Sequence, residues 1–351
     1  MAQYTRNESR QWAKENLDGL INVIIPSFTQ DLKGLNEKGI RHDVRKCIEL
    51  GFTGTLLVSE VVMSLEEYIE FTKIAVDEAA GKLTIVHHAS FNTLEDNIEA
   101  VQLAEEAGAD LVLLSYPSNF YPKNSQEIYE YTKAVCDATN LGVILFPVPL
   151  WNFERLHPAA IDPKIIRQML DHIPNIVAIK AEGGMPLVAG FTQCYQLFND
   201  EVIVMTPLEK DAFAIGNLVP LQFMGTSNYE MYGDTLPKLF NKMKEGKYEE
   251  VYEQYWKLQP ARQTVGKLMA SSDGAGLVNR MLWKYAAWLN GFNGGPLRQP
   301  TMKINQSQMS AIRQALIASG IEVTQEDDSQ FFVGRFPETA SEKNENTLIN
   351  N

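Results

Sequence analysis

The sequence predicts a barrel of eight parallel β-strands with connecting helices, a (β/α)8 or TIM barrel of the α/β class, followed by a C-terminal helical extension. Short apolar runs rich in β-branched residues recur at intervals of about 20–35 residues, the length of a strand–helix unit. Helical patterns lie between them. A doubly wound open sheet is the alternative, but the chain has no GxGxxG after its first strand and no GxxxxGK(S/T) motif, so a nucleotide-binding fold gains no support.

Eight runs along the chain have the composition of buried strands. They cover residues 20–26, 54–58, 83–87, 110–114, 142–146, 176–180, 202–205 and 222–225. Amphipathic helical patterns lie at residues 64–80, 94–107, 125–138 and 163–171. In the first of these helices, Ser64 and Glu67 have the spacing of a capping box, which marks a helix start.

Beyond the eighth strand the pattern becomes helical only. Helices are expected at residues 236–245, 248–258, 278–289 and 306–319, with Gly294-Gly295-Pro296 separating the last two. We therefore expect an N-terminal arm (1–17), a barrel (18–234), a helical region (235–322) and a polar tail (323–351). The composition of the tail is that of a segment that is partly disordered or lies on a partner.

Composition limits the possible partners. The net charge of −13 comes from 44 acidic and 31 basic residues, and no basic stripe is available to bind nucleic acid. No stretch has the ~18 apolar residues of a membrane span. The N-terminus lacks the apolar core of a signal peptide, and Cys47, Cys136 and Cys194 form no CxxC pair, so we expect a cytoplasmic protein. The adjacent His87 and His88 lack metal-ligand spacing, and we expect neither a metal nor another cofactor.

Lys180 is the strongest functional candidate. It ends the apolar run of the sixth strand and is followed by Ala181-Glu182-Gly183-Gly184. In a barrel of this kind, chemistry takes place at the carboxyl ends of the strands. Desolvation there disfavours the ammonium form, which makes lysine a nucleophile for carbonyl carbon. The alternative is a lysine whose amine merely reaches solvent from a strand end.

Several segments, in order along residues 17–321, carry a resemblance to a known family. They are IPSF (25–28), IVAIKAEGG (176–184), MGTSNY (224–229) and GGPLRQP (294–300). Together they resemble the class I, Schiff-base-forming aldolases related to dihydrodipicolinate synthase and N-acetylneuraminate lyase, of which this chain is a divergent member. The resemblance implies that Lys180 forms a Schiff base with a carbonyl substrate, and that the protein is a homo-oligomer, a tetramer or a dimer.

The loop after the second strand departs from this family. The family has a Gly-Thr-Thr-Gly-Glu loop whose threonines hold the carboxylate of a 2-oxo acid, whereas residues 56–61 read LLVSEV. Ser59 could supply a hydroxyl group. Glu60 occupies the position of the family's glutamate and would repel a substrate carboxylate, so the resemblance does not establish a pyruvate-like substrate.

The fifth strand also departs from the family. The family's tyrosine, which relays protons beside the lysine, is replaced by Phe146, which can neither donate nor accept a proton. The arginine that often follows in the synthases is absent too. Of the two histidines at the third strand end, alternation predicts that His88 points inward. A strand-end histidine is usually structural, but without the tyrosine the site needs a base near pH 7, and His88 is the candidate.

The remaining candidates are expected to shape the substrate site. Trp151 would form an aromatic lid, which favours a substrate with a hydrophobic or aromatic portion. Glu182 is interpreted as a solvated loop acid. Gly183 would let the chain pass close to the substrate. The turn after the eighth strand would offer hydroxyls and amides from Gly225, Thr226 and Ser227.

The sequence thus predicts a lyase of the aldolase or hydratase-aldolase type that acts through Lys180 on a small-molecule carbonyl substrate such as a 2-oxo acid. This is favoured over the lysine-pathway synthase because the threonine pair, the tyrosine and the arginine are all missing. Two alternatives remain open. One is a dehydratase or decarboxylase that uses the same lysine, and the other is a non-catalytic barrel that binds a carbonyl metabolite.

Overall fold

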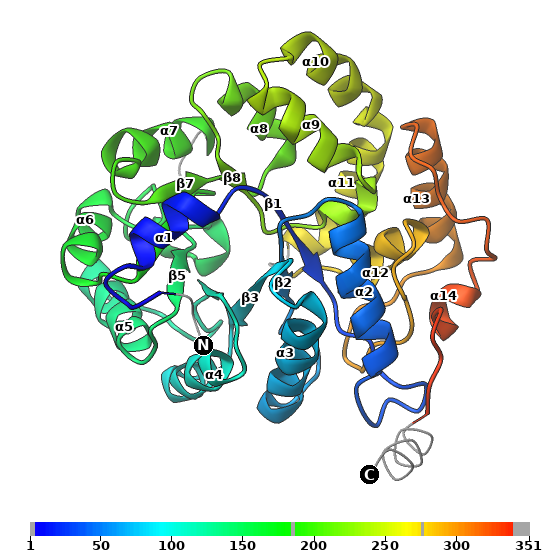
Figure 1. Ribbon diagram of the computed structural model, residues 1–351, viewed down its shortest axis with the longest axis horizontal. Helices are drawn as coiled ribbons and strands as arrows, with labels where there is room; N and C mark the ends of the chain where they lie inside the picture. The colour runs from blue at the N-terminus through cyan, green and yellow to red at the C-terminus, as the bar shows by residue number, and fades with distance from the viewer. Residues whose placement is uncertain (1–3, 184–186, 275–276, 340–351) are drawn as a thin grey trace.

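The computed structural model describes residues 4–183, 187–274 and 277–339 of the 351-residue chain. Eight strands form one parallel sheet in the order β7-β6-β5-β4-β3-β2-β1-β8, which closes nearly completely into a barrel surrounded by helices (Figure 1). The predicted (β/α)8 barrel is therefore confirmed. The strands are β1 (Gly19–Ile24), β2 (Gly54–Leu57), β3 (Thr84–Ala89), β4 (Leu111–Leu114), β5 (Gly142–Leu145), β6 (Ile176–Lys180), β7 (Ile203–Met205) and β8 (Phe223–Met224).

The helices of the barrel lie outside the strands. They are α2 (Glu37–Glu49), α3 (Leu65–Ala79), α4 (Leu94–Glu106), α5 (Ser125–Asp137), α6 (Pro163–His172), α7 (Leu187–Phe198) and α8 (Glu209–Gly216). The capping box at the start of α3 is present as expected, because the Ser64 side chain accepts from the Glu67 backbone and the Glu67 side chain accepts from the Ser64 backbone. Strands enclosed by helices on one face and by the barrel interior on the other are buried on both faces, and every residue of β6 is buried.

The amino-terminal end of the barrel is covered by α1 (Ser9–Asn16), which precedes the first strand. Its Arg10 donates hydrogen bonds to the backbone carbonyls of Leu170, Ile173 and Ile176, at the end of α6 and the start of β6. This end of the barrel is therefore held together by hydrogen bonds from the Arg10 side chain to the backbone, and the functional residues are expected at the opposite end.

The helical extension comprises α9 (Thr235–Lys244), α10 (Tyr248–Lys257), α11 (Gln259–Gly274), α12 (Arg280–Leu289), α13 (Gln306–Ala318) and the short α14 (Gln330–Val333), with single 3-10 turns η1 (Pro149–Trp151), η2 (Phe153–Arg155) and η3 (Tyr229–Tyr232) elsewhere in the chain. Four of these helices were expected. The 16-residue α11 was not, because Pro260 and Gly266 interrupt its pattern. None of the described helices is both long and apolar enough to cross a membrane.

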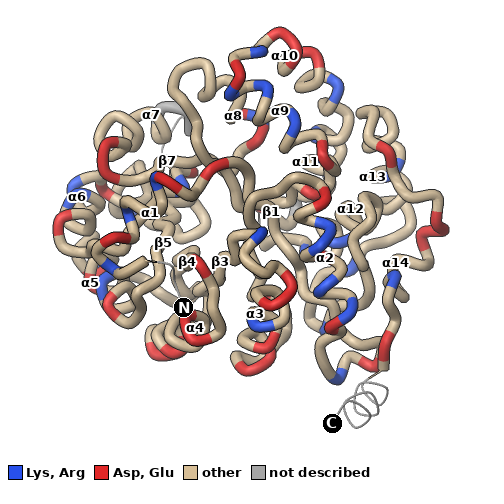
Figure 2. The backbone as a smooth tube through the Cα atoms, viewed as in Figure 1, with Lys and Arg blue, Asp and Glu red and all other residues tan. Residues whose placement is uncertain are grey.

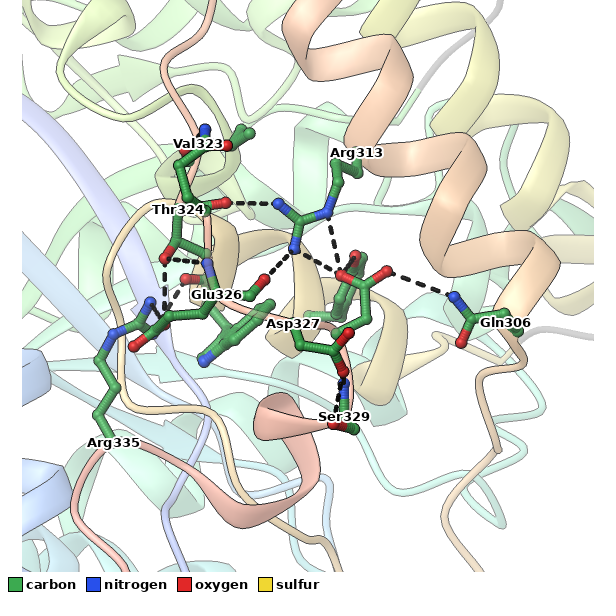
Figure 3. Close-up of polar contacts among 12 residues, drawn as sticks. Gln306, Arg313, Val323, Thr324, Glu326, Asp327, Ser329 and Arg335 are labelled. Carbon is green, nitrogen blue, oxygen red and sulfur yellow. Dashed lines mark hydrogen bonds and ion pairs between the residues drawn. The ribbon is translucent and has the colours of Figure 1, made fainter.

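The described part of the polar tail packs on the protein's own helices. Phe331 is fully buried, with its ring 5.3 Å from that of Tyr285 in α12. Arg313 of α13 pairs with Asp328. It also donates to the carbonyl of Thr324, as Figure 3 shows. Residues 323–339 thus belong to the folded body, while the rest of the expected tail, 340–351, lies outside the described residues.

Charged residues are interspersed over the outer helices in the view of Figure 2. Basic residues gather on α2, but Arg41 pairs with Asp77 and Glu78 of α3, and Arg45 also pairs with Glu78. The charges of these two arginines are therefore balanced by acidic residues of the neighbouring helix.

Candidate active site

A cavity of about 540 Å³ lies at the carboxyl ends of the strands. Its base is formed by the strand ends, among them Leu56, His88 and Lys180. The 3-10 turn η1 and the helices α11 and α12 supply further walls, including Trp151, Met269 and Trp283. The C-terminal extension therefore helps to build the site.

Lys180 is buried at the end of β6, and its amine lies in this cavity. Nζ donates to the backbone oxygen of Thr226 at 3.3 Å and lies 3.2 Å from its Oγ1. It also lies 3.6 Å from the centroid of the Phe146 ring. Burial lowers the pKa of Lys180 to about 8, and the negative charge of Glu182 opposes this shift. An appreciable fraction of the amine is therefore uncharged near neutral pH, as a nucleophile requires.

Phe146 and Trp151 form an aromatic wall beside the lysine. The two rings meet edge to face, with centroids 5.7 Å apart. The indole Nε1 of Trp151 donates to the backbone oxygen of Phe146 at 2.6 Å, which fixes η1 against the end of β5. No hydroxyl group takes the place of the family's tyrosine at position 146, so proton transfer must use other groups.

The two adjacent histidines point in opposite directions, as the alternation predicts. His88 lines the cavity, while the ring of His87 packs 4.8 Å from that of Tyr68 in α3. In His88, Nδ1 lies 3.2 Å from Oγ of Ser59 and Nε2 lies 2.8 Å from Oγ of Ser115. The imidazole is thus held between two serine hydroxyls.

The protonation state of His88 differs from the expectation of a base near pH 7. Burial, together with the charge of Lys180, lowers the pKa of His88 to about 3. The imidazole is therefore neutral at physiological pH, with one ring nitrogen as donor and the other as acceptor. Such a ring can accept a proton on one nitrogen and release one from the other, but it does not stay doubly protonated.

The predicted site residues divide into two groups. Besides Lys180 and His88, the residues that line the cavity are Glu60, Phe146, Trp151, Thr226 and Ser227. Ser59 lies behind His88 and reaches the site only through its ring.

Both predicted glycines belong to the supporting wall. A Cβ at Gly183 would lie 2.7 Å from the backbone oxygen of Ala159, and one at Gly225 would overlap the backbone oxygen of Ile21. Gly225 also has a φ of +150°, which disfavours other residues. These positions require glycine for backbone packing and not for the approach of a substrate, and Gly184 lies outside the described residues.

Four residues of the cavity differ from or add to the sequence analysis. Ser115 was missed, although a polar residue that ends the apolar run of β4 is the same signal that identified Lys180. Arg280 of α12 was also missed, and it forms an ion pair with Glu60, so this glutamate is not the unopposed negative charge that was expected. Glu182 lines the cavity, and burial raises the pKa of its carboxyl while Lys180 and Lys210 lower it, so it is not the solvated acid that was expected.

A buried lysine at the end of the sixth strand of a (β/α)8 barrel is the arrangement of a class I aldolase. Sequence comparison supplies the family: residues 16–319 match the model of the Dihydrodipicolinate synthetase family, and the chain belongs to it. The enzyme is a lyase.

Individual relatives are distant. The 4-hydroxy-tetrahydrodipicolinate synthase of Methanopyrus kandleri is 25% identical over 315 residues, which cover 87% of this chain and 97% of the relative. The structure of Proteus mirabilis N-acetylneuraminate lyase has a TM-score of 0.74 at 18% identity, covering 87% of this chain and 99% of its own. A dihydrodipicolinate synthase variant described as the first monomeric one aligns with a TM-score of 0.72 at 20% identity, covering 87% of this chain and 97% of its own. These structures share the fold, and the expected homo-oligomer stays a prediction.

Proposed function

We propose that this protein is a Schiff-base-forming lyase of the aldolase or hydratase-aldolase type, in which Lys180 attacks the carbonyl carbon of a small-molecule substrate. The observation that carries the proposal is the state of Lys180. Its amine is buried, its pKa is lowered to about 8, and it lies in a cavity of about 540 Å³ at the catalytic end of the barrel.

The chemistry follows from an uncharged amine in a largely apolar site. Nζ adds to the carbonyl carbon, the resulting carbinolamine loses water, and a protonated imine forms. The imine draws electrons from a bond at the neighbouring carbon, so a C–C bond can break or form there, and hydrolysis then frees the lysine. The backbone oxygen of Thr226, 3.3 Å from Nζ, accepts a hydrogen bond from the amine and orients it.

Proton transfer is assigned to His88 and the two serines that flank it. Phe146 cannot perform it. A neutral imidazole between Ser59 and Ser115 can accept a proton on one nitrogen while it releases one from the other. The low pKa favours this relay over a stable imidazolium, because burial and the nearby lysine both disfavour a second positive charge.

The walls indicate what surrounds the reacting carbonyl. Phe146, Trp151, Met269 and Trp283 line much of the cavity with apolar surface. A substrate with a hydrophobic or aromatic portion would bury that portion here, with its carbonyl at Lys180.

The test is trapping of the imine with borohydride, followed by intact-mass measurement. Pyruvate and benzaldehyde are the first two probes, each applied to the wild type, Lys180→Ala and Lys210→Ala. Lys210 is the matched control, because it is an exposed lysine beside the same cavity. We expect a mass gain in the wild type and in Lys210→Ala that disappears in Lys180→Ala. Adducts that persist in Lys180→Ala, or no adduct with any of a wider panel of carbonyls, would refute the proposal.

Because Phe146 replaces the tyrosine that transfers protons in the family, a second candidate function is a barrel that binds a carbonyl metabolite without turning it over. Such a protein would trap carbonyl compounds at Lys180 but would not exchange the protons on the neighbouring carbon. A carbonyl compound that traps on the protein and carries hydrogens next to its carbonyl is incubated with the protein in D₂O without borohydride and followed by NMR. Exchange of those hydrogens separates the two functions, since it requires an enamine and a working proton relay.

A further inference from the structure

Arg280 is a second cationic side chain in the cavity that contains Lys180. It is the first residue of α12, only 9% of its surface is exposed, and it lines the cavity. Its Nε is buried and has no hydrogen-bond partner among the described residues. A buried guanidinium with an unused donor is costly, unless a ligand supplies the acceptor.

The ion-pair partner of Arg280 among the described residues is more exposed to solvent than Arg280 itself. Nη2 pairs with Oε2 of Glu60, whose side chain is 37% exposed, compared with 10% for that of Arg280. The guanidinium carbon also lies 4.7 Å from the centroid of the Trp283 ring. A guanidinium has five donors arranged to receive a carboxylate through two parallel hydrogen bonds, and Glu60 leaves much of that capacity free.

A second arginine in the same cavity provides the contrast. Arg262 donates from Nε to Oε1 of Glu209 at 2.8 Å and from Nη2 to Oε2 at 2.7 Å. Its Nη1 donates to the backbone oxygen of Tyr255. Arg262 is therefore satisfied on every nitrogen by the protein itself, whereas Arg280 is not.

We propose that Arg280 binds a carboxylate of the substrate at a position separate from the carbonyl that reacts with Lys180. Glu60 is the resident counter-ion, and the incoming carboxylate displaces it toward solvent, where its partial exposure makes the movement inexpensive. The substrate class is then a carbonyl compound with an apolar or aryl body and a carboxylate. This inference rests on the proposed imine chemistry for its reaction, but the anion site can be tested without it.

The competing explanation is structural. The ion pair could simply hold the loop after β2 against α12. In that case its loss would lower stability and would weaken the binding of charged and neutral substrates equally.

The first experiment uses two aldehydes that differ in one group, 4-carboxybenzaldehyde and 4-methylbenzaldehyde. The half-saturating concentration for borohydride trapping is measured for each on the wild type, Arg280→Met, Glu60→Gln and the control Lys210→Ala, which removes an exposed positive charge beside the same cavity. We expect the wild type to favour the carboxylated aldehyde by at least about tenfold, the scale of a hydrogen-bonded charge pair. Arg280→Met should abolish this ratio, Glu60→Gln should raise it several-fold, and Lys210→Ala should leave it unchanged.

The second experiment separates this inference from the imine chemistry. Binding of 4-methylbenzoate and 4-methylbenzamide is measured by calorimetry on Lys180→Ala and on Lys180→Ala/Arg280→Met. Arg280-dependent binding of the benzoate alone supports the anion site even if no carbonyl compound traps on Lys180. If Arg280→Met does not fold, Arg280→Lys and Glu60→Gln carry the test. The proposal is overturned if the wild type does not distinguish the two aldehydes, or if the Arg280 and Glu60 variants weaken both equally.

Discussion

Two lysines of this protein, Lys180 at the end of β6 and Lys284 in α12, are both buried, but only Lys180 faces a cavity. Burial lowers the pKa of both amines. Lys180 lines the cavity, beside the ring of Phe146. Lys284 is outside that lining, and its Nζ donates to the backbone oxygen of Pro26 at 2.7 Å, with the buried carboxylate of Asp43 as its counter-charge.

A lowered pKa does not by itself identify a nucleophile. An amine must also have space for a carbonyl compound and must not be committed to a fixed partner. Nζ of Lys284 is committed to the backbone oxygen of Pro26, which connects α12 to the segment that follows β1. Lys180 has an accessible amine, and Lys284 has a structural role.

The largest effect is expected for Lys180→Met. Trapping should fall at least about 10³-fold, because the nucleophile is gone. Stability should change in the opposite direction. A lysine with a pKa of about 8 in the folded state, against 10.5 when unfolded, destabilises the protein below pH 8, and this cost disappears as the pH rises toward 10.5. At pH 7 the variant should therefore be more stable than the wild type by up to about 3 kcal/mol, as measured by urea unfolding. A loss of stability would contradict this account of the desolvated amine.

Lys284→Met should reverse both results. Removal of the Lys284 amine leaves the backbone oxygen of Pro26 without its donor and removes the charge that opposes the desolvation of Asp43, whose pKa burial raises to about 7, at a cost of about 1–3 kcal/mol. The free energy of unfolding in urea should fall by that amount, while the folded protein should still trap carbonyl compounds on Lys180. The double variant Asp43→Asn/Lys284→Met is the control and should recover much of the loss. If Lys284→Met abolished trapping without loss of stability, the distinction between the two lysines would be wrong.

The sequence predicted those features of the fold and the site that depend on the pattern of neighbouring residues along the chain. Short apolar runs identified all eight strands to within a few residues, and the residue that ends β6 identified the catalytic candidate. Alternation along β3 distinguished the direction of His88 from that of His87.

What sequence could not predict depends on how distant segments meet. Arg280 is far from Lys180 along the chain, and only the placement of α12 over the strand ends brings it into the cavity. The pKa of His88 depends on burial and on the nearby Lys180, neither of which can be inferred from β3 alone. The effect of the Glu60 charge on a substrate likewise depends on a distant residue, because Glu60 is paired with Arg280.

The two histidines of β3 also differ in their surroundings, because His88 lines the cavity and His87 packs against Tyr68. With a carbonyl compound that traps on the wild type and carries hydrogens next to its carbonyl, His88→Phe should slow exchange of those hydrogens in D₂O by about 10²-fold, because the relay is lost. The imine should still be trapped. His87→Leu is the matched control, since its ring nitrogens have no partner among the described residues and its ring faces α3. Equal slowing in both variants would show that any disturbance of β3 slows the exchange, and would contradict the proton relay through His88.

The smallest effect is expected at Phe146, and it concerns what sets the pKa of Lys180. The rate of trapping should rise with pH around a midpoint of about 8, because only the uncharged amine attacks. The ring face lies 3.6 Å from Nζ and stabilises the ammonium form. Replacing it in Phe146→Leu should therefore lower the midpoint by about 0.4–1 pH unit, equivalent to a weak cation–π interaction.

Trp151→Leu is the control for this shift, because it also enlarges the cavity but removes a ring that contacts Phe146 and not the amine. Its midpoint should stay near that of the wild type. If both variants raised the midpoint, entry of water would outweigh the loss of the ring, because added water stabilises the ammonium form. The aromatic wall would then act on Lys180 chiefly by excluding solvent, and burial alone would separate the reactive lysine from an ordinary one.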